Sequence, residues 1–130
     1  MRAARACLGA RFRPQGRAPA HGLDCAGVVL HAARAVGCGV PVVGPYRLDG
    51  DGLCEQLLAG LAAAGFAARP VGLAFPGDLL AAEVAAGRPH LAVLTAAGAV
   101  HAHAGLRRVV EGPLDPAWRW LGTFRFPDPE

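Results

Sequence analysis

The chain contains no lysine, so all 13 of its basic residues are arginines, and its formal net charge is +3. Several of these arginines lie near the N-terminus, at Arg2, Arg5, Arg11, Arg13 and Arg17. A basic patch of this kind could contact nucleic acid or an anionic cell-wall polymer. No recognisable nucleic-acid-binding motif accompanies it. We therefore expect a solvated basic face and no nucleic-acid partner.

Long apolar runs are also missing. No stretch reaches the roughly 18 consecutive apolar residues that a membrane-spanning helix needs. The first residues, Met1 to Leu8, lack the apolar core of a secretory signal. We therefore expect no membrane span and synthesis in the cytosol, with any external substrate reached by another route.

Cysteine is sparse, and Cys7, Cys25, Cys38 and Cys54 include no C-x-x-C pair. This spacing disfavours a zinc site, and a reducing compartment disfavours disulfides. We expect Cys7, Cys38 and Cys54 to be small buried or half-buried residues.

The length of 130 residues predicts one domain, residues 1–130, with a single core. Helical patterns cover residues 2–9, about 24–36 and 53–64, and glycines follow the second and third of them. Residues 10–22 and 38–50 are rich in glycine and proline and are expected to be loops.

After Gly65 the pattern changes to short apolar runs that predict strands. The expected strands are residues 78–84, 90–95, 98–103, 107–111 and 118–126, with a tight turn at Ala96-Ala97. Helices followed by a meander of strands predict an α+β fold, with N-terminal helices packed on an antiparallel sheet of about five strands.

Cys25 follows Asp24, a favourable N-cap residue, and therefore lies in the first turn of the second helix. The backbone N–H groups and the dipole at a helix N-terminus stabilise an anion, and this favours the nucleophilic thiolate. The alternative is that Cys25 only packs in the core, as most cysteines of apolar helices do.

Three histidines lie in the expected strands. His101 and His103 are two residues apart and point to the same face, while His90 opens the neighbouring strand within reach of one or the other. A thiolate on a helix, an imidazole from a sheet and a third group that orients the imidazole form a nucleophilic triad. The rival interpretation is a zinc site made by these histidines and Cys25. Beyond His101-x-His103, no acidic ligand or close-spaced pair supports it.

The segment Leu23-Asp24-Cys25-Ala26-Gly27-Val28-Val29 resembles the Asp-Cys-Ser-Gly-apolar signature of the NlpC/p60 cell-wall peptidases, a papain-like family. Four further segments resemble motifs of that family in the same order. They are residues 7–16, Pro76-Gly77-Asp78-Leu79-Leu80, Pro89-His90-Leu91-Ala92-Val93 and Ala99-Val100-His101-Ala102. The resemblance extends from Ala4 to about Val110, which is most of the chain.

This resemblance implies Cys25 as the nucleophile, His90 as the base and His101 as the residue that orients the base. It implies hydrolysis of amide bonds in peptidoglycan stem peptides, or in a similar amide, without a metal or cofactor. The backbone N–H of Cys25 would donate to the oxyanion.

Other positions near the site are assigned a substrate or oxyanion role on weaker grounds. Phe12 stands where the family usually has a tyrosine that helps the oxyanion, and Gln15 could replace that donor. Ala26 stands where serine is common. Asp24 adjoins the nucleophile, and His103 could line the cleft or compete with His101.

The family comparison and the missing signal suggest a phage-tail or gene-transfer-agent peptidase, with particle proteins as partners, released with a particle or by lysis. Two alternatives stay open. One is a catalytically weak or inactive phage-tail structural domain of the same fold, which Phe12 and Ala26 favour. The other is a cytosolic amidase acting on recycled cell-wall peptides.

Overall fold

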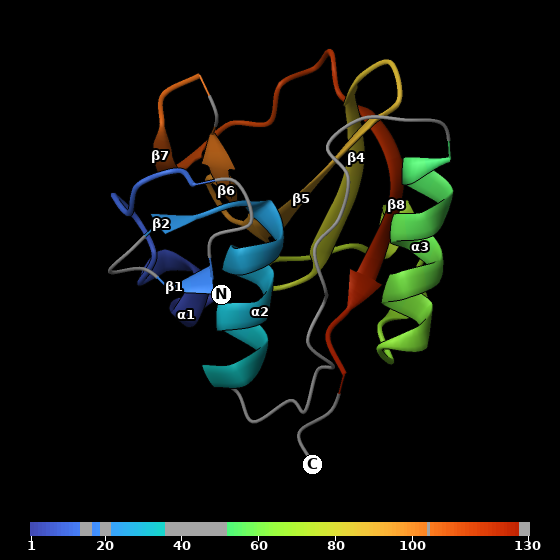
Figure 1. Cartoon of the computed structure of the whole chain (residues 1–130). Coiled ribbons are helices and arrows are strands. Elements are labelled where there is room, and N and C mark those ends of the chain that lie inside the picture. Colours follow the sequence, from blue (N-terminus) through green and yellow to red (C-terminus); the bar gives the residue numbers. More distant parts are fainter. Residues whose placement is uncertain (14–16, 19–21, 36–51, 104, 128–130) are drawn as a thin grey trace.

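A computed structural model describes residues 1–13, 17–18, 22–35, 52–103 and 105–127. Its main feature is a six-stranded sheet with the strand order β3-β8-β4-β5-β6-β7, in which every ladder is antiparallel (Figure 1). The strands are β3 (Ala67–Arg69), β4 (Leu79–Ala85), β5 (Arg88–Thr95), β6 (Gly98–His103), β7 (Arg108–Gly112) and β8 (Arg119–Arg125). The predicted α+β class is confirmed. The sheet has six strands instead of the expected five or so.

The additional strand is β3, which the sequence pattern did not predict. Two of its three residues are alanines, which have little preference for strands. Its place is set by the end of helix α3 (Leu53–Ala63), where Gly65 has a φ of 93°. The Phe66 N–H donates to the Leu61 carbonyl at 3.0 Å and the Gly65 N–H to the Ala62 carbonyl at 3.1 Å, which is a Schellman motif. This turn directs the chain onto the edge of β8.

The N-terminal segment is less helical than predicted. Helix α1 spans Arg2–Arg5, and the chain then turns through i→i+3 hydrogen bonds to Gly9, whose φ is 82°. The expected loop at residues 10–22 contains β1 (Arg17–Ala18), which pairs with β2 (Gly22–Leu23). Residues 36–51, with Cys38 and the expected loop at 38–50, lie outside the described residues.

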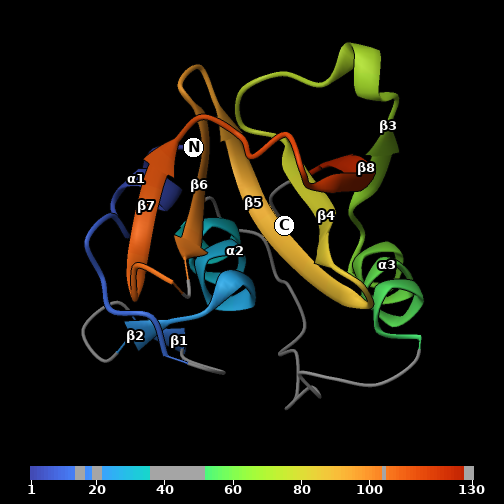
Figure 2. The same ribbon diagram turned by 90° about the horizontal axis from the view of Figure 1, so that it is seen from above.

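Helices α2 (Cys25–Ala35) and α3 both pack on one face of the sheet. Helix α2 contributes Val28 and Ala32 to a first apolar cluster with Val93, Val100 and Val109. Helix α3 contributes Leu61, and α2 contributes Val29, to a second cluster with Leu79, Ala81 and Leu91. Figure 2 shows both helices beside the strands that they cover.

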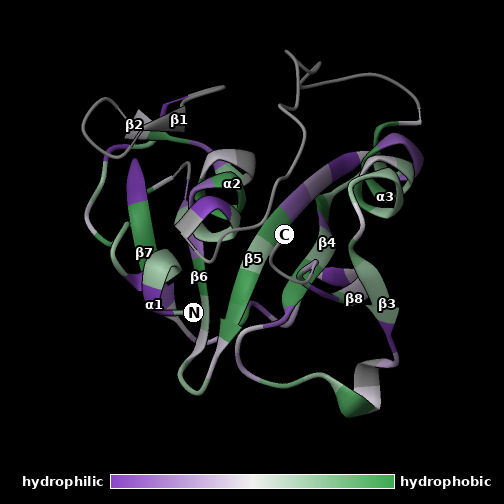
Figure 3. Ribbon diagram, turned by 90° about the horizontal axis from the view of Figure 1, so that it is seen from below, coloured by the Kyte–Doolittle hydropathy of each residue, from purple (hydrophilic) through white to green (hydrophobic). Residues whose placement is uncertain are grey.

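The opposite face carries a third cluster of Leu80, Ala82, Ala92, Leu94 and Ala99, against which Leu114, Trp118 and Trp120 pack. Leu91 to Thr95 are therefore buried on both faces of the sheet. Figure 3 shows β5 as hydrophobic over most of its length and hydrophilic where it begins. Its continuous apolar run is typical of a strand buried on both sides.

Strands β5 and β6 separate soon after their shared turn. Their ladder comprises Val93↔Val100, Leu94↔Ala99 and Thr95↔Gly98, with the predicted turn at Ala96-Ala97. Farther from the turn, β5 continues along β4 to Ala85↔Arg88, and β6 continues along β7 to His103↔Arg108. Both Figures 1 and 2 show α2 between β6 and β5. The sheet thus opens beside the helix that begins at Cys25.

No helix among the described residues is long and apolar enough to cross a membrane.

Candidate active site

The first turn of α2 is held by Asp24, as predicted. The Asp24 side chain is buried, and its Oδ1 accepts the Gly27 N–H at 2.8 Å. The backbone carbonyl of Asp24 accepts the Val28 N–H at 3.1 Å, the first bond of the helical ladder. Asp24 therefore acts as the N-cap that fixes the position of the next residue.

Cys25 is the first residue of α2 and is half-buried. Its side chain packs at the edge of the second cluster, so it is not sealed in the interior. The described cysteines Cys7, Cys25 and Cys54 are not joined to one another by disulfides.

His90 and His101 form a direct contact. Nε2 of His90 lies 2.8 Å from Nδ1 of His101, and the two ring planes are almost perpendicular, at 86°. The sequence left His101 and His103 as alternative partners of His90, and the structure joins His90 to His101.

This contact depends on the opening between the strands. Continuing the register of Val93↔Val100 would set His90 opposite His103. Because β5 and β6 have separated, the His90 ring instead meets the His101 ring diagonally. His103 points its Nδ1 at the N–H of Leu106, 3.1 Å away, and so supports the turn before β7.

Burial lowers the pKa of both imidazoles. Desolvation, with a smaller effect of the charges of His101 and His103, lowers the pKa of His90 to about 3. Desolvation and the charge of His103 lower the pKa of His101 to about 4. Both rings are therefore neutral at pH 7.

Trp118 contacts both histidines, and the sequence pattern did not predict this contact. Its ring lies edge-on to His90, with centroids 5.1 Å apart, and edge-on to His101, with centroids 5.0 Å apart. Nothing in the local sequence signals this contact, because the tryptophan follows the last long connection and reaches β5 and β6 only in the folded chain.

The faces of the sheet place the imidazoles and the sulfur differently. His90 is opposite Ala82 on β4, and His101 shares its side of β6 with Ala99, so both belong to the face of the third cluster. Cys25 packs on the face of the second cluster. The histidine pair lies beyond the end of the β5–β6 ladder, and α2, which begins at Cys25, packs against both of these strands.

The remaining predicted positions have the following places. Phe12 forms a parallel bridge with Leu23, and its side chain packs against the first cluster. Asp24 is engaged in the helix cap. Gln15 lies outside the described residues.

Cys54 and Cys7 have the properties of structural thiols, and their expected burial is confirmed. Sγ of Cys54 donates to Oε2 of Glu83 at 3.6 Å, and Glu83 also accepts from Nε of Arg119 at 3.2 Å. Burial and the neighbouring Glu83 carboxylate raise the pKa of Cys54, and burial raises the pKa of Cys7. Both are held as thiols, which are poor nucleophiles.

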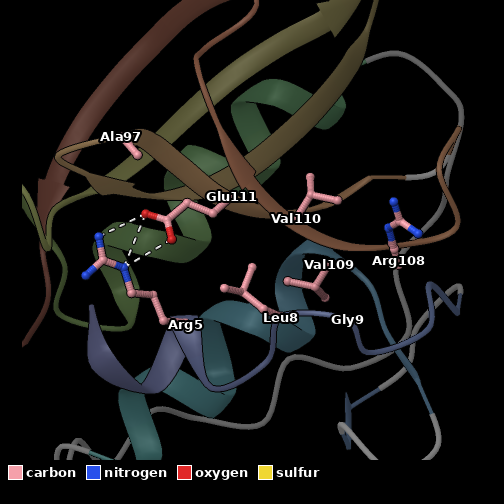
Figure 4. A pocket seen from close by; sticks show the side chains of 8 residues that line it. All are labelled: Arg5, Leu8, Gly9, Ala97, Arg108, Val109, Val110 and Glu111. Carbon is pink, nitrogen blue, oxygen red and sulfur yellow. Dashed lines mark hydrogen bonds and ion pairs between the residues drawn. The ribbon is translucent and has the colours of Figure 1, made fainter.

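A shallow surface depression of about 630 Å³, open to solvent, lies apart from these residues, between α1 and β7 (Figure 4). An ion pair of Arg5 and Glu111, 2.9 Å long, lies at one side of it. Its lining includes none of the candidate catalytic residues. Among the described residues, including Cys25 and the three strand histidines, no three His, Cys, Asp or Glu side chains are grouped so that they could hold a metal ion.

The fold is similar to that of a solved domain of a peptidoglycan hydrolase. The chain is similar to the structure titled "Crystal structure of NlpC/p60 domain of peptidoglycan hydrolase SagA", with a TM-score of 0.65 and 22% sequence identity. The match covers 95% of this chain and 92% of that chain. The chain therefore has the NlpC/p60 fold. No family model and no curated protein sequence matches it. The phage-tail expectation receives no support from these comparisons.

Proposed function

We propose that this chain, which has the NlpC/p60 fold, is a cysteine peptidase that hydrolyses amide bonds of peptidoglycan stem peptides through Cys25, His90 and His101. The observation that carries the proposal is the 2.8 Å contact of His90 Nε2 with His101 Nδ1. It lies where the sheet opens beside α2, the helix that begins at Cys25. The similarity to a domain of a peptidoglycan hydrolase supports the choice of substrate.

In this proposal, Nδ1 of His90 acts as the base. Because Nε2 faces His101, Nδ1 is the nitrogen that remains for the proton of Cys25. The proposal requires that Nε2 carries a hydrogen and donates it to Nδ1 of His101, which orients the ring. A neutral His90 at pH 7 is in the protonation state that accepts a proton.

The reaction then has two halves. Sγ of Cys25 forms a bond with the carbonyl carbon of the amide while its proton moves to Nδ1 of His90. The C–N bond breaks, the amine leaves with that proton, and a thioester remains. Water then attacks the thioester, gives one proton to His90, and releases the carboxylic acid, after which the proton returns to Cys25.

The helix N-terminus supports the charged intermediates of both halves. The backbone N–H of Cys25 and the positive end of the α2 dipole favour an anion at this position. Phe12 has no hydroxyl, so in this proposal the backbone takes the role that a tyrosine would have.

The experiment is to incubate the purified chain with defined stem peptides and with intact peptidoglycan, and to identify the products by mass spectrometry. We expect a pair of fragments whose masses sum to the substrate plus one water. The Cys25→Ala variant should yield none. The Cys54→Ala variant should retain activity, because Cys54 is bound to Glu83.

Two outcomes would favour the alternatives. A folded protein that cleaves no substrate would be a non-catalytic domain of the same fold, the alternative that Phe12 and Ala26 favour. A protein that cleaves free peptides but not intact peptidoglycan would be an amidase of recycled cell-wall peptides.

A further inference from the structure

Trp118 contacts both members of the histidine pair. Its ring centroid lies 5.1 Å from that of His90 and 5.0 Å from that of His101, and both ring pairs are edge-to-face, at 74° and 83°. These separations and angles are within the range favoured by aromatic pairs. One side chain thus contacts two imidazoles that come from different strands.

The backbone before Trp118 is held in a tight turn. The Trp118 N–H donates to the Asp115 carbonyl at 3.1 Å, and the Ala117 N–H donates to Oδ1 of Asp115 at 2.9 Å. Aspartate followed by proline, here Pro116, is a favoured start of such a turn. Leu114 and Trp118 both pack against the third cluster, so the turn is fastened to the sheet on both sides.

We propose that Trp118 is a positioning residue, which holds the His90 and His101 rings in contact and keeps water from them. The proposal rests on the catalytic role proposed for the histidines. β5 and β6 are not paired at His90 and His101, so the backbone ladder does not hold the two rings together. The Trp118 ring supplies a rigid apolar surface that both imidazoles share.

The properties of the pair agree with this role. Burial is the largest cause of the lowered pKa of both histidines. The charge of His103 lowers the pKa of both histidines and that of His101 lowers the pKa of His90, while the third-cluster side chains on the same face are apolar. Removing the indole would admit water and favour the charged imidazolium.

Trp120 provides the matched control. It packs against the same third cluster, two residues farther along the chain, and is half-buried like Trp118. Ring contacts with His90 and His101 are described for Trp118 and not for Trp120. A general loss of packing should therefore appear in variants of both tryptophans, and a loss of positioning in variants of Trp118 alone.

The first measurement uses the two variants Trp118→Leu and Trp120→Leu of the full chain. The pKa values of His90 and His101 are followed by NMR titration of the ring nitrogens. We expect Trp118→Leu to raise both by about one unit or more and Trp120→Leu to leave them in place. Unchanged values in a folded Trp118→Leu variant would overturn the proposal.

The second measurement uses conservative tryptophan-to-phenylalanine variants, in which an aromatic ring remains at each position, so that misfolding is avoided. Since the chain has two tryptophans, Trp120→Phe leaves Trp118 as the sole indole fluorophore, and Trp118→Phe leaves Trp120. An imidazolium quenches a neighbouring indole. As the histidines become protonated at low pH, the fluorescence of Trp118 in the Trp120→Phe variant should therefore be quenched. The fluorescence of Trp120 in the Trp118→Phe variant should not be. Equal responses would also overturn the proposal.

Neither measurement requires hydrolysis, so failure of the positioning role and failure of the peptidase are distinguishable. If hydrolysis is observed, Trp118→Leu should lower kcat about tenfold with little change in KM and move the acid limb of the pH profile upward. A rise of KM alone would make Trp118 a substrate-binding residue and would overturn the positioning role.

Discussion

Nε2 of His90 meets Nδ1 of His101 at 2.8 Å across two strands whose backbones have already parted. Side chains, and not the ladder, connect β5 and β6 at this point. The proposed chemistry requires Cys25 to reach His90 past this point, because Cys25 packs on one face of the sheet and the imidazoles belong to the other.

The first prediction concerns the order of importance of the histidines. His90→Ala should remove hydrolysis almost as completely as Cys25→Ala, because it removes the proposed base. His101→Ala should be milder, about 10- to 100-fold in kcat, because it removes only the group that orients the base. The measurement is kcat on a defined stem peptide. Full activity of His101→Ala, with loss of activity in His103→Ala, would transfer the orienting role to His103.

The second prediction concerns thiol reactivity. Iodoacetamide near pH 7 should label Cys25 faster than Cys7 or Cys54, because burial raises the pKa of both of those thiols and Glu83 raises that of Cys54 further. Peptide mapping after timed labelling gives the four separate rates. If Cys25 reacts no faster than the other cysteines, it is not an activated nucleophile.

The third prediction concerns stability against pH. His90 and His101 have pKa values of about 3 and about 4 in the folded chain, below the ordinary value of about 6.5 in the unfolded chain. As the pH falls below 6.5, the unfolded chain binds protons that the folded chain does not. Stability should therefore be lost from pH 6.5 downward, by up to about 1.4 kcal/mol per pH unit for each group.

Urea denaturation between pH 7 and pH 4.5 measures this loss. The part of that window above about pH 5.5 is the most informative, because the carboxylates of Glu83 and Glu111, whose pKa values are also lowered from 4.5, contribute with the same sign at lower pH. A variant with His90→Gln and His101→Gln should show a flatter dependence. An equally steep dependence in that variant would assign the effect to other groups.

The fourth prediction concerns the hairpin that carries the two histidines. Gly98 has a φ of 130°, and a Cβ added there would meet the Gly112 carbonyl group and lie 2.8 Å from Cα of Pro113. Backbone cannot move aside easily, so Gly98→Ala should cost about 2–4 kcal/mol of the free energy of unfolding. Gly112→Ala is the control, since a Cβ there would meet nothing within 4 Å. Similar melting temperatures for the two variants would contradict the prediction.

The fifth prediction concerns the cap of α2. Asp24→Ala removes the acceptor of the Gly27 N–H and should cost about 1 kcal/mol. Asp24→Asn retains an oxygen that can accept this bond and should restore most of the loss. Chemical denaturation of both variants gives the comparison. Equal destabilisation would mean that the charge of Asp24, and not its cap bond, matters.

Several elements could be predicted from the sequence because their signals are local. The aspartate before the apolar repeat specified the start of α2, and Gly65 specified the end of α3. The apolar alternation around Ala96-Ala97 specified the β5–β6 hairpin, with β6 predicted at its observed bounds. The order of five short motifs indicated the fold that the structural comparison supports.

Other features depended on distant parts of the chain. Strand β3 is made of residues with little strand preference and exists because β8 offers an edge beside the end of α3. The helix expected at residues 2–9 ends after Arg5, because the Gly9 N–H bonds to Val109 of β7. Such partners are separated by many residues and leave no periodic signal.

The sequence by itself determined which groups are available: a thiol at a capped helix start and imidazoles at alternating positions of short strands. Capping and alternation act over a few residues, so they are readable without a fold. Only the tertiary structure decided that His101 and not His103 meets His90, and that Trp118 covers both rings. The first depends on where strands β5 and β6 separate, and the second on where the turn before Trp118 meets the sheet. Both positions are set by the packing of the whole chain.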